Sequence, residues 1–203
     1  MSMELLQELN PGFVMILAGF LSFLIRPAIL RAFVTIGGPL LALILLRLYS
    51  DFSVDHGVIS LMGIEMVTYR VDSLSFIFVL AFGIAAVLNS IYSLHIDDPL
   101  QEGCGLIYAG AAVAAAAAGD LLTIFIFWEL TAISSVFLIW RSGTKAAYKA
   151  GMRYLAIQIL SGVLLLFGAT FYLQNHGDLH VRAISLQENG AWLIFIALGI
   201  KAA

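Results

Sequence analysis

The feature that most constrains this chain is a series of long apolar runs joined by short polar connections. A helix that crosses a bilayer needs roughly 20 mainly apolar residues. Backbone in lipid must also satisfy its own hydrogen bonds, which favours helices. The sequence predicts six spans and a truncated seventh. They cover residues 13–25, 28–46, 74–94, 106–118, 121–140, 154–173 and 191–203.

The composition agrees with a membrane location. Hydrophobic residues make up 62% of the 203 residues and charged residues only 11%, whereas a soluble domain carries about a quarter charged residues. Such a chain cannot cover itself with polar surface. We therefore predict an all-α integral membrane protein, a multispanning bundle of about six to seven transmembrane helices in one membrane domain, residues 1–203.

Residues 48–72 form the one sizeable connection, between the second and third runs. The stretch GVISLMGIEMVTYRVD alternates apolar and polar residues around a glycine, which predicts a short β-hairpin on the outer surface. Before the first run, Glu4 and Glu8 occur without any Lys or Arg. A cleaved signal peptide begins with a basic segment, so we expect the first span to be retained.

The loop cations indicate an orientation. Six of the nine fall on two connections, around residues 26–31 and 141–153, while Arg47, Arg70 and Arg182 fall on the opposite side. Cytoplasmic loops carry an excess of Lys and Arg. We therefore expect a multi-pass protein of the cell (inner) membrane with its N-terminus outside.

Other classes of site leave no trace in the sequence. There is no metal-ligand spacing, no phosphate-binding glycine loop, no nucleophile motif and no basic block for nucleic acid, and Cys104 is the single cysteine. We predict no cofactor, no metal, no nucleic-acid partner, no catalytic residue and no internal disulfide.

Two charged residues lie inside apolar runs. Glu129 follows Leu121 by eight residues and Lys201 follows Gly190 by eleven, which places them about 12 Å and 16 Å deep at 1.5 Å per residue. The hydrocarbon slab is about 30 Å thick, and ionisable residues at such depth are costly and usually functional.

Opposite charges at similar depth can neutralise one another if their helices are neighbours. Separating them would favour the neutral form of each, releasing a proton from Lys201 and placing one on Glu129. Such a pair is a proton switch. The alternative is a static ion pair that ties two helices together.

Uncharged polar residues in the same spans are weaker candidates. Thr131, Ser134, Gln158 and Ser161 could line a water path, although such side chains more often bond a backbone carbonyl or join helices. Asp120 precedes the 121–140 run, and we expect it to cap that helix rather than to carry protons.

Several segments resemble one membrane family. GDLLTIFIFWELTAISSVFLIW is similar to the fifth helix of the antiporter-like subunits of Mrp-type Na⁺/H⁺ antiporters and respiratory complex I, and IFIALGIKAA resembles their seventh helix. YLAIQILSGVLLLFGATFYL resembles the sixth helix and YRVDSLSFIF the start of the third. The resemblance covers most of residues 65–203, and it implies that Glu129 and Lys201 are the functional charges.

The resemblance accounts for only the first half of such a protein. The family has about fourteen helices, with two inverted five-helix repeats. Residues 1–95 would be its three N-terminal helices, and residues 105–203 the first part of the antiporter-like repeat, truncated. We therefore expect a fragment or a split subunit, with half of a proton path.

Three functions remain open. The first is a component like the D subunit of an Mrp-type antiporter, which exchanges H⁺ for a monovalent cation such as Na⁺. The second is a proton-pumping membrane subunit of an NADH–quinone oxidoreductase or a related hydrogenase complex, without a redox centre of its own. The third is an inactive structural remnant. The first two imply other membrane subunits as partners, and the small-residue face of residues 111–118 is the expected contact.

Overall fold

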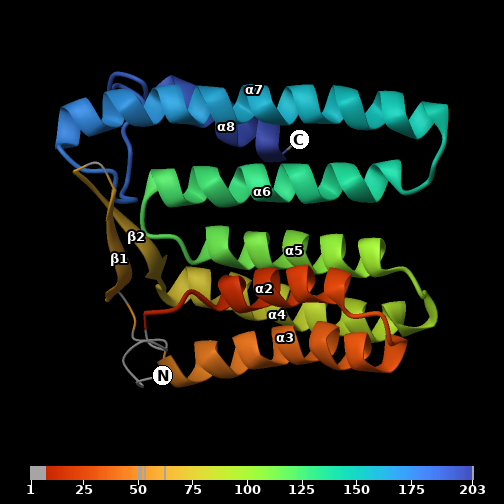
Figure 1. Ribbon diagram of the computed structural model, residues 1–203. Coiled ribbons are helices and arrows are strands. Elements are labelled where there is room, and N and C mark those ends of the chain that lie inside the picture. The colour runs from red at the N-terminus through yellow and green to blue at the C-terminus, as the bar shows by residue number, and fades with distance from the viewer. Residues whose placement is uncertain (1–7, 50–51, 53, 62, 203) are drawn as a thin grey trace.

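The computed structural model describes residues 8–49, 52, 54–61 and 63–202. Glu4 and Ala203, which entered the expectations above, lie outside this range. Within it, helices lie side by side as a bundle and run alternately in opposite directions, with a β-hairpin across one end (Figure 1). The helices are α2 (Pro11–Leu24), α3 (Ala28–Tyr49), α4 (Ser73–Tyr92), α5 (Pro99–Ala116), α6 (Leu121–Trp140), α7 (Lys145–His176) and α8 (Ala191–Ala202).

These helices confirm the predicted fold class. Four of them, α3, α4, α6 and α7, are long and apolar enough to cross a membrane. The apolar helices α2 and α8 are shorter in the described residues, with 14 and 12 residues. The exposed side chains of α2 and α8 are mostly apolar. Such faces suit contact with lipid, where no water is available to hydrate polar groups.

Two helices begin earlier than the apolar pattern predicts. α5 starts at Pro99, where Asp98 accepts hydrogen bonds from the next turn, and α7 starts at Lys145, where Thr144 caps it. Side-chain caps of this kind satisfy the free N–H groups of a first turn. Lys149 and Arg153 therefore lie within a helix, not within a loop. At 1.5 Å per residue the 32 residues of α7 span about 48 Å.

The predicted hairpin is present between α3 and α4. Strand β1 (Asp55–Leu61) pairs antiparallel with β2 (Ile64–Arg70), with Val58 opposite Val67. Residues 50, 51, 53 and 62 of this loop lie outside the described part. We call the end of the bundle that carries the strands the hairpin end. The other end, where the connections 25–27, 93–98 and 141–144 lie, is the basic end (Figure 1).

Helix α5 packs closely against α2 through small residues. A Cβ on Gly110 would lie 2.8 Å from the Gly12 carbonyl oxygen, so the two backbones touch. Ala111 and Ala114 are fully buried in this contact. Part of the face expected to meet another subunit is therefore used inside the chain. Small residues allow such close approach, and in lipid close packing replaces the hydrophobic driving force.

Candidate functional site

Glu129 lies near the middle of α6, eight residues from the hairpin end of the helix. Its side chain is partly buried and rests against Gly162 of α7, where a methyl group would overlap the carboxylate. The Oε1 atom is buried and has no hydrogen-bond partner among the described residues. A buried polar atom without a partner is costly, so this carboxylate is not accounted for by stability.

Lys201 lies in the last turn of α8 in the described range and reaches α6. Its Nζ atom donates to the carbonyl oxygen of Trp128, at 3.0 Å, and stands 5.5 Å from the centre of the Trp128 ring. A cation over an indole face is attracted by the ring quadrupole. The ammonium group therefore has one main-chain acceptor and one aromatic face as its environment.

Both charged side chains lie at the same turn of α6 but have different neighbours. Lys201 binds at Trp128, while the neighbouring Glu129 side chain faces Gly162. The ion pairs within 4.0 Å among the described residues do not include one between Glu129 and Lys201. The direct pair that the sequence suggested is thus not closed in this structure, and the switch stays a prediction.

A pocket of about 500 Å³ adjoins Lys201. It is bounded by residues of five helices, and its wall combines aromatic rings, alanines and a few polar groups. The lining residues are Phe82, Tyr108, Ala112, Ala115, Ala116, Ile124, Trp128, Thr131, Tyr154, Gln158 and Lys201. Gln158 is 9% exposed, and its Oε1 atom is buried without a partner in the described chain.

Thr131 and Gln158, two of the four predicted water-path residues, line this pocket with Lys201. The Thr131 hydroxyl donates to the Trp128 carbonyl oxygen at 2.7 Å, the same atom that Lys201 binds. Ser134 and Ser161 lie elsewhere. Ser134 donates to Leu130 within α6 and borders a different hollow, and Ser161 donates to the Ala197 carbonyl of α8 at 2.9 Å.

The polar groups near this pocket that were not singled out from the sequence include the Tyr154 side chain and the Trp128 carbonyl group. The Tyr154 side chain lines the pocket, and its hydroxyl oxygen accepts from Ser135 at 3.0 Å. Tyr154 stands four residues before Gln158, so both belong to one helix face, and that spacing could have indicated it. The Trp128 carbonyl could not have been found, because every residue carries one.

Asp120 has the capping role that the sequence predicted. It is fully buried, and its carboxylate accepts from the Thr123 amide at 2.8 Å at the start of α6. It also accepts from the Val67 amide of β2 at 2.7 Å. Its backbone pairs with that of His180. Asp120 therefore joins the hairpin, α6 and the loop after α7 into one unit at the hairpin end.

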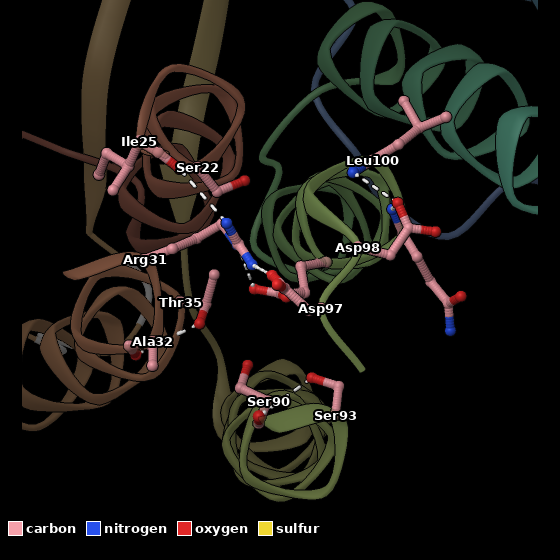
Figure 2. Close-up of polar contacts among 12 residues, drawn as sticks. Ser22, Ile25, Arg31, Ala32, Thr35, Ser90, Ser93, Asp97, Asp98 and Leu100 are labelled. Carbon is pink, nitrogen blue, oxygen red and sulfur yellow. Dashed lines mark hydrogen bonds and ion pairs between the residues drawn. The ribbon is translucent and has the colours of Figure 1, made fainter. Parts of the chain in front are cut away.

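A second buried charge cluster lies at the basic end. Arg31 of α3 is 2% exposed and pairs with Glu102 of α5 at 3.1 Å. It also pairs with Asp97 (Figure 2). Its guanidinium further donates to the carbonyl groups of Ile25 and Arg26. The sequence pattern treated Arg31 as a loop cation, and this was wrong: Arg31 lies in the first turn of α3, and its buried side chain pairs with two carboxylates. Asp98 pairs likewise with Arg141.

The chain is similar to known membrane proteins. The family model described as "NADH:quinone oxidoreductase/Mrp antiporter, TM" matches residues 118–203. An uncharacterized protein of Methanocaldococcus jannaschii is 36% identical over 64 residues, which cover 32% of this chain and 13% of that protein. The D subunit of the Na(+)/H(+) antiporter of Bacillus subtilis is 27% identical over 137 residues, 64% of this chain and 28% of that protein. The chain thus spans less than a third of either relative.

A solved structure shares the fold over nearly the whole chain. It belongs to the membrane-bound sulfane sulfur reductase, an archaeal respiratory membrane complex, with a TM-score of 0.68 and 18% identity. The match covers 98% of this chain and 43% of that one. At this identity the likeness concerns the arrangement of helices.

Proposed function

We propose that this chain, which is similar to antiporter-like membrane subunits, moves protons within a multisubunit antiporter that exchanges H⁺ for a monovalent cation, Na⁺ in the first instance. Glu129 and Lys201 carry the protons in this proposal. One observation supports it above all: within an apolar helix, the buried Oε1 atom of Glu129 has no hydrogen-bond partner among the described residues. Lys201 lies in a second apolar helix, where a carbonyl oxygen is the acceptor of its Nζ atom.

The chemistry follows from this lack of partners. A group with several strong partners is held in one protonation state, whereas Glu129 and Lys201 have little to hold them. In the proposal, movement of Lys201 from the Trp128 carbonyl towards Glu129 favours both charged forms, and movement away favours both neutral forms. Water in the pocket beside Thr131, Tyr154 and Gln158 would then take up or deliver the proton.

The test is exchange in everted membrane vesicles from cells that carry the full assembly. Glu129→Gln and Lys201→Ala should each abolish Na⁺-driven H⁺ movement while immunoblotting finds the protein at its usual level. Lys201→Arg should fare little better, because a guanidinium does not readily release its proton. Glu65→Gln on the exposed hairpin and Lys149→Ala on the exposed start of α7 are the matched controls. Exchange retained in Glu129→Gln would refute the proton site.

The fold also supports a second candidate function, that of a membrane subunit of a respiratory complex. The structural match is to a respiratory membrane complex, and the family description names both kinds of assembly. In that case this chain would be a proton-moving membrane subunit, with redox chemistry in other subunits. Vesicles separate the two: acidification that needs an electron donor indicates the respiratory role, and pH change on adding NaCl alone indicates the antiporter.

The proposal extends to membrane placement. The connections 25–27 and 141–144 lie at the basic end (Figure 1). They contain Arg26 and Arg141, and Lys145 and Lys149 follow in the first turns of α7. An excess of cations marks cytoplasmic loops. We assign that end to the cytoplasm and the hairpin end, with the N-terminus, to the outside of the inner membrane. Residues 1–95 would form the N-terminal helices, and residues 105–203 the first part of the antiporter-like repeat, with other membrane subunits as partners.

A further inference from the structure

Helix α7 is longer than a bilayer requires, and its first turns carry a row of cations. Its 32 residues span about 48 Å at 1.5 Å per residue, against about 30 Å of hydrocarbon. Lys145, Lys149 and Arg153 follow one another at intervals of four residues, and all three are exposed. Because residues four apart share a helix face, they form one row, which we call the α7 cation row.

The carboxylates at the basic end are bound to other cations. Asp97 and Glu102 pair with Arg31, and Asp98 pairs with Arg141. The ion pairs among the described residues include none of the three members of the α7 cation row. The row therefore presents three positive charges that the described part of the chain does not neutralise.

The local electrostatics of α7 also oppose the row. The dipole of a helix favours carboxylates at its start and disfavours cations there, and the first turn of α7 contains no acidic residue. Like charges four residues apart repel one another as well. An anion from outside the described chain would relieve both effects, so the row fits an acidic partner.

Two aromatic rings mark the level of the row in the membrane. Trp140, the last residue of α6, stacks on Tyr148 with 5.6 Å between the ring centres. Trp and Tyr are enriched where the hydrocarbon meets the headgroups. Lys149 directly follows Tyr148 in the sequence. It therefore lies at headgroup level, where phosphate groups of lipids are the abundant anions.

Further into the membrane the same face of α7 is apolar. Leu160 and Val163 follow Arg153 by seven and ten residues, which continues the helical spacing of the row, and both side chains are more than half exposed. Ten residues of helix extend about 15 Å, half of the hydrocarbon slab. A cationic surface that continues as an apolar one through one leaflet matches an anionic lipid. An acidic protein loop would fit only the cationic part.

We propose that the α7 cation row binds an anionic phospholipid of the leaflet at the basic end. The phosphate group lies between Lys149 and Arg153, and an acyl chain runs along Leu160 and Val163. The long stem of Arg153 lies along the helix surface and keeps its guanidinium group at the level of the phosphate.

This lipid site lies apart from the proposed proton site. Gly162, which contacts Glu129, comes thirteen residues after Lys149. At about 100° per residue this places Gly162 on the opposite side of α7. Exchange and lipid binding are therefore measured separately, and failure of one does not decide the other.

The test maps lipid contacts on the full assembly in phosphatidylcholine vesicles. The vesicles contain a small, equal share of one of two probes with a photoreactive acyl chain, either anionic phosphatidylglycerol or zwitterionic phosphatidylcholine. After irradiation, mass spectrometry locates the adducts. The internal comparison is α4, whose exposed face contains no Lys or Arg. Residues 157–167 of α7 should favour the anionic probe about fivefold or more relative to α4, as expected for cations near a membrane surface.

Variants identify the groups that hold the headgroup. Lys145→Gln, Lys149→Gln and Arg153→Gln in one chain should reduce the preference for the anionic probe to the value found on α4. These side chains are exposed, so the variant should fold. Arg26→Gln is the matched control, because it removes an exposed cation at the same end but outside the row. The preference should persist in this control.

Equal preference on α7 and α4 in the wild type would overturn the lipid site, and this result needs no variant. A preference that persists in the triple variant would overturn it too, because the row would not hold the headgroup. A lack of adducts on α7 with either probe would also refute it. Carbodiimide cross-links from the row to another subunit would then identify an acidic protein partner instead.

Discussion

Arg31 and Lys201 are both cations inside the bundle, the first buried and the second half-buried, and their surroundings differ. Arg31 is bound by two carboxylates and two carbonyl groups at the basic end, while Lys201 has one carbonyl oxygen and one indole ring in the middle of the bundle. A planar guanidinium with five donors suits a fixed multidentate site, and an ammonium group is the one that gives up a proton. Arg31 is thus a charge that holds helices in place, whereas Lys201 is a charge whose protonation state can change.

Replacing Arg31 should have the largest effect and tests whether this cation holds the helices in place. Arg31→Met strands the Glu102 carboxylate, and breaking a buried pair costs about 3–5 kcal/mol. We expect a sharp fall in the free energy of unfolding, measured in a detergent titration, and with it less folded protein. Arg26→Met removes an exposed cation from the connection just before α3 and should change little.

The companion variant sharpens the result. Arg31→Met combined with Glu102→Gln should recover part of the lost stability, because the stranded charge is gone. A normal level of folded Arg31→Met protein that cannot exchange protons would contradict the structural role of Arg31.

Gly162→Ala tests the crowding around Glu129. A methyl group there meets the carboxylate and the Phe125 ring, and overpacking of this kind costs about 1–3 kcal/mol. Because the Glu129 side chain can turn away, we expect a larger loss of exchange than of stability. Gly37→Ala is the control, since beyond the nearby backbone of its own helix no described heavy atom lies within 4 Å of the added Cβ. Equal exchange in the two variants would mean that the position of Glu129 does not matter.

Asp72 is a charge of a third kind, exposed and held by the start of its own helix. It accepts from the amides of Leu74 and Ser75, and the Ser75 backbone and hydroxyl groups hold its pKa below the usual value. Asp72→Ala should cost about 1 kcal/mol of unfolding free energy at neutral pH, as for other N-caps, with exchange intact.

The pH dependence at Asp72 has a definite sign. A lowered pKa in the folded state adds stability above the pKa of the unfolded chain, and that stability is lost as the pH falls through the folded value. Unfolding measured at successive pH values should therefore find wild type and Asp72→Ala converging in acid. A gap that widens in acid would contradict the assigned contacts.

The sequence predicted the helices well because burial in lipid leaves few alternatives. The 121–140 run coincides with α6, and the alternation in residues 57–72 predicted the hairpin that the structure has between Asp55 and Arg70. The helix boundaries that are set by side-chain caps were harder to predict. The apolar run begins at residue 154, whereas α7, which Thr144 caps, begins nine residues earlier at Lys145.

The site was predictable only in part. Glu129 and Lys201 stand out because charges in apolar runs are rare, and both do lie inside the bundle. Their surroundings depend on which helices meet. No pattern in the sequence indicates that Glu129 faces Gly162, or that the Arg31 side chain turns inward between Asp97 and Glu102.

The carbonyl oxygen of Trp128 has a consequence for genetics. Any amino acid at position 128 would still present this acceptor, since every residue has a backbone carbonyl. A saturation screen for loss of function would therefore identify Lys201 without identifying what binds it, and substitutions at Trp128 would report only on the ring. The hydrogen-bond acceptor of this lysine is therefore fixed by the fold of the main chain and not by the type of residue at position 128.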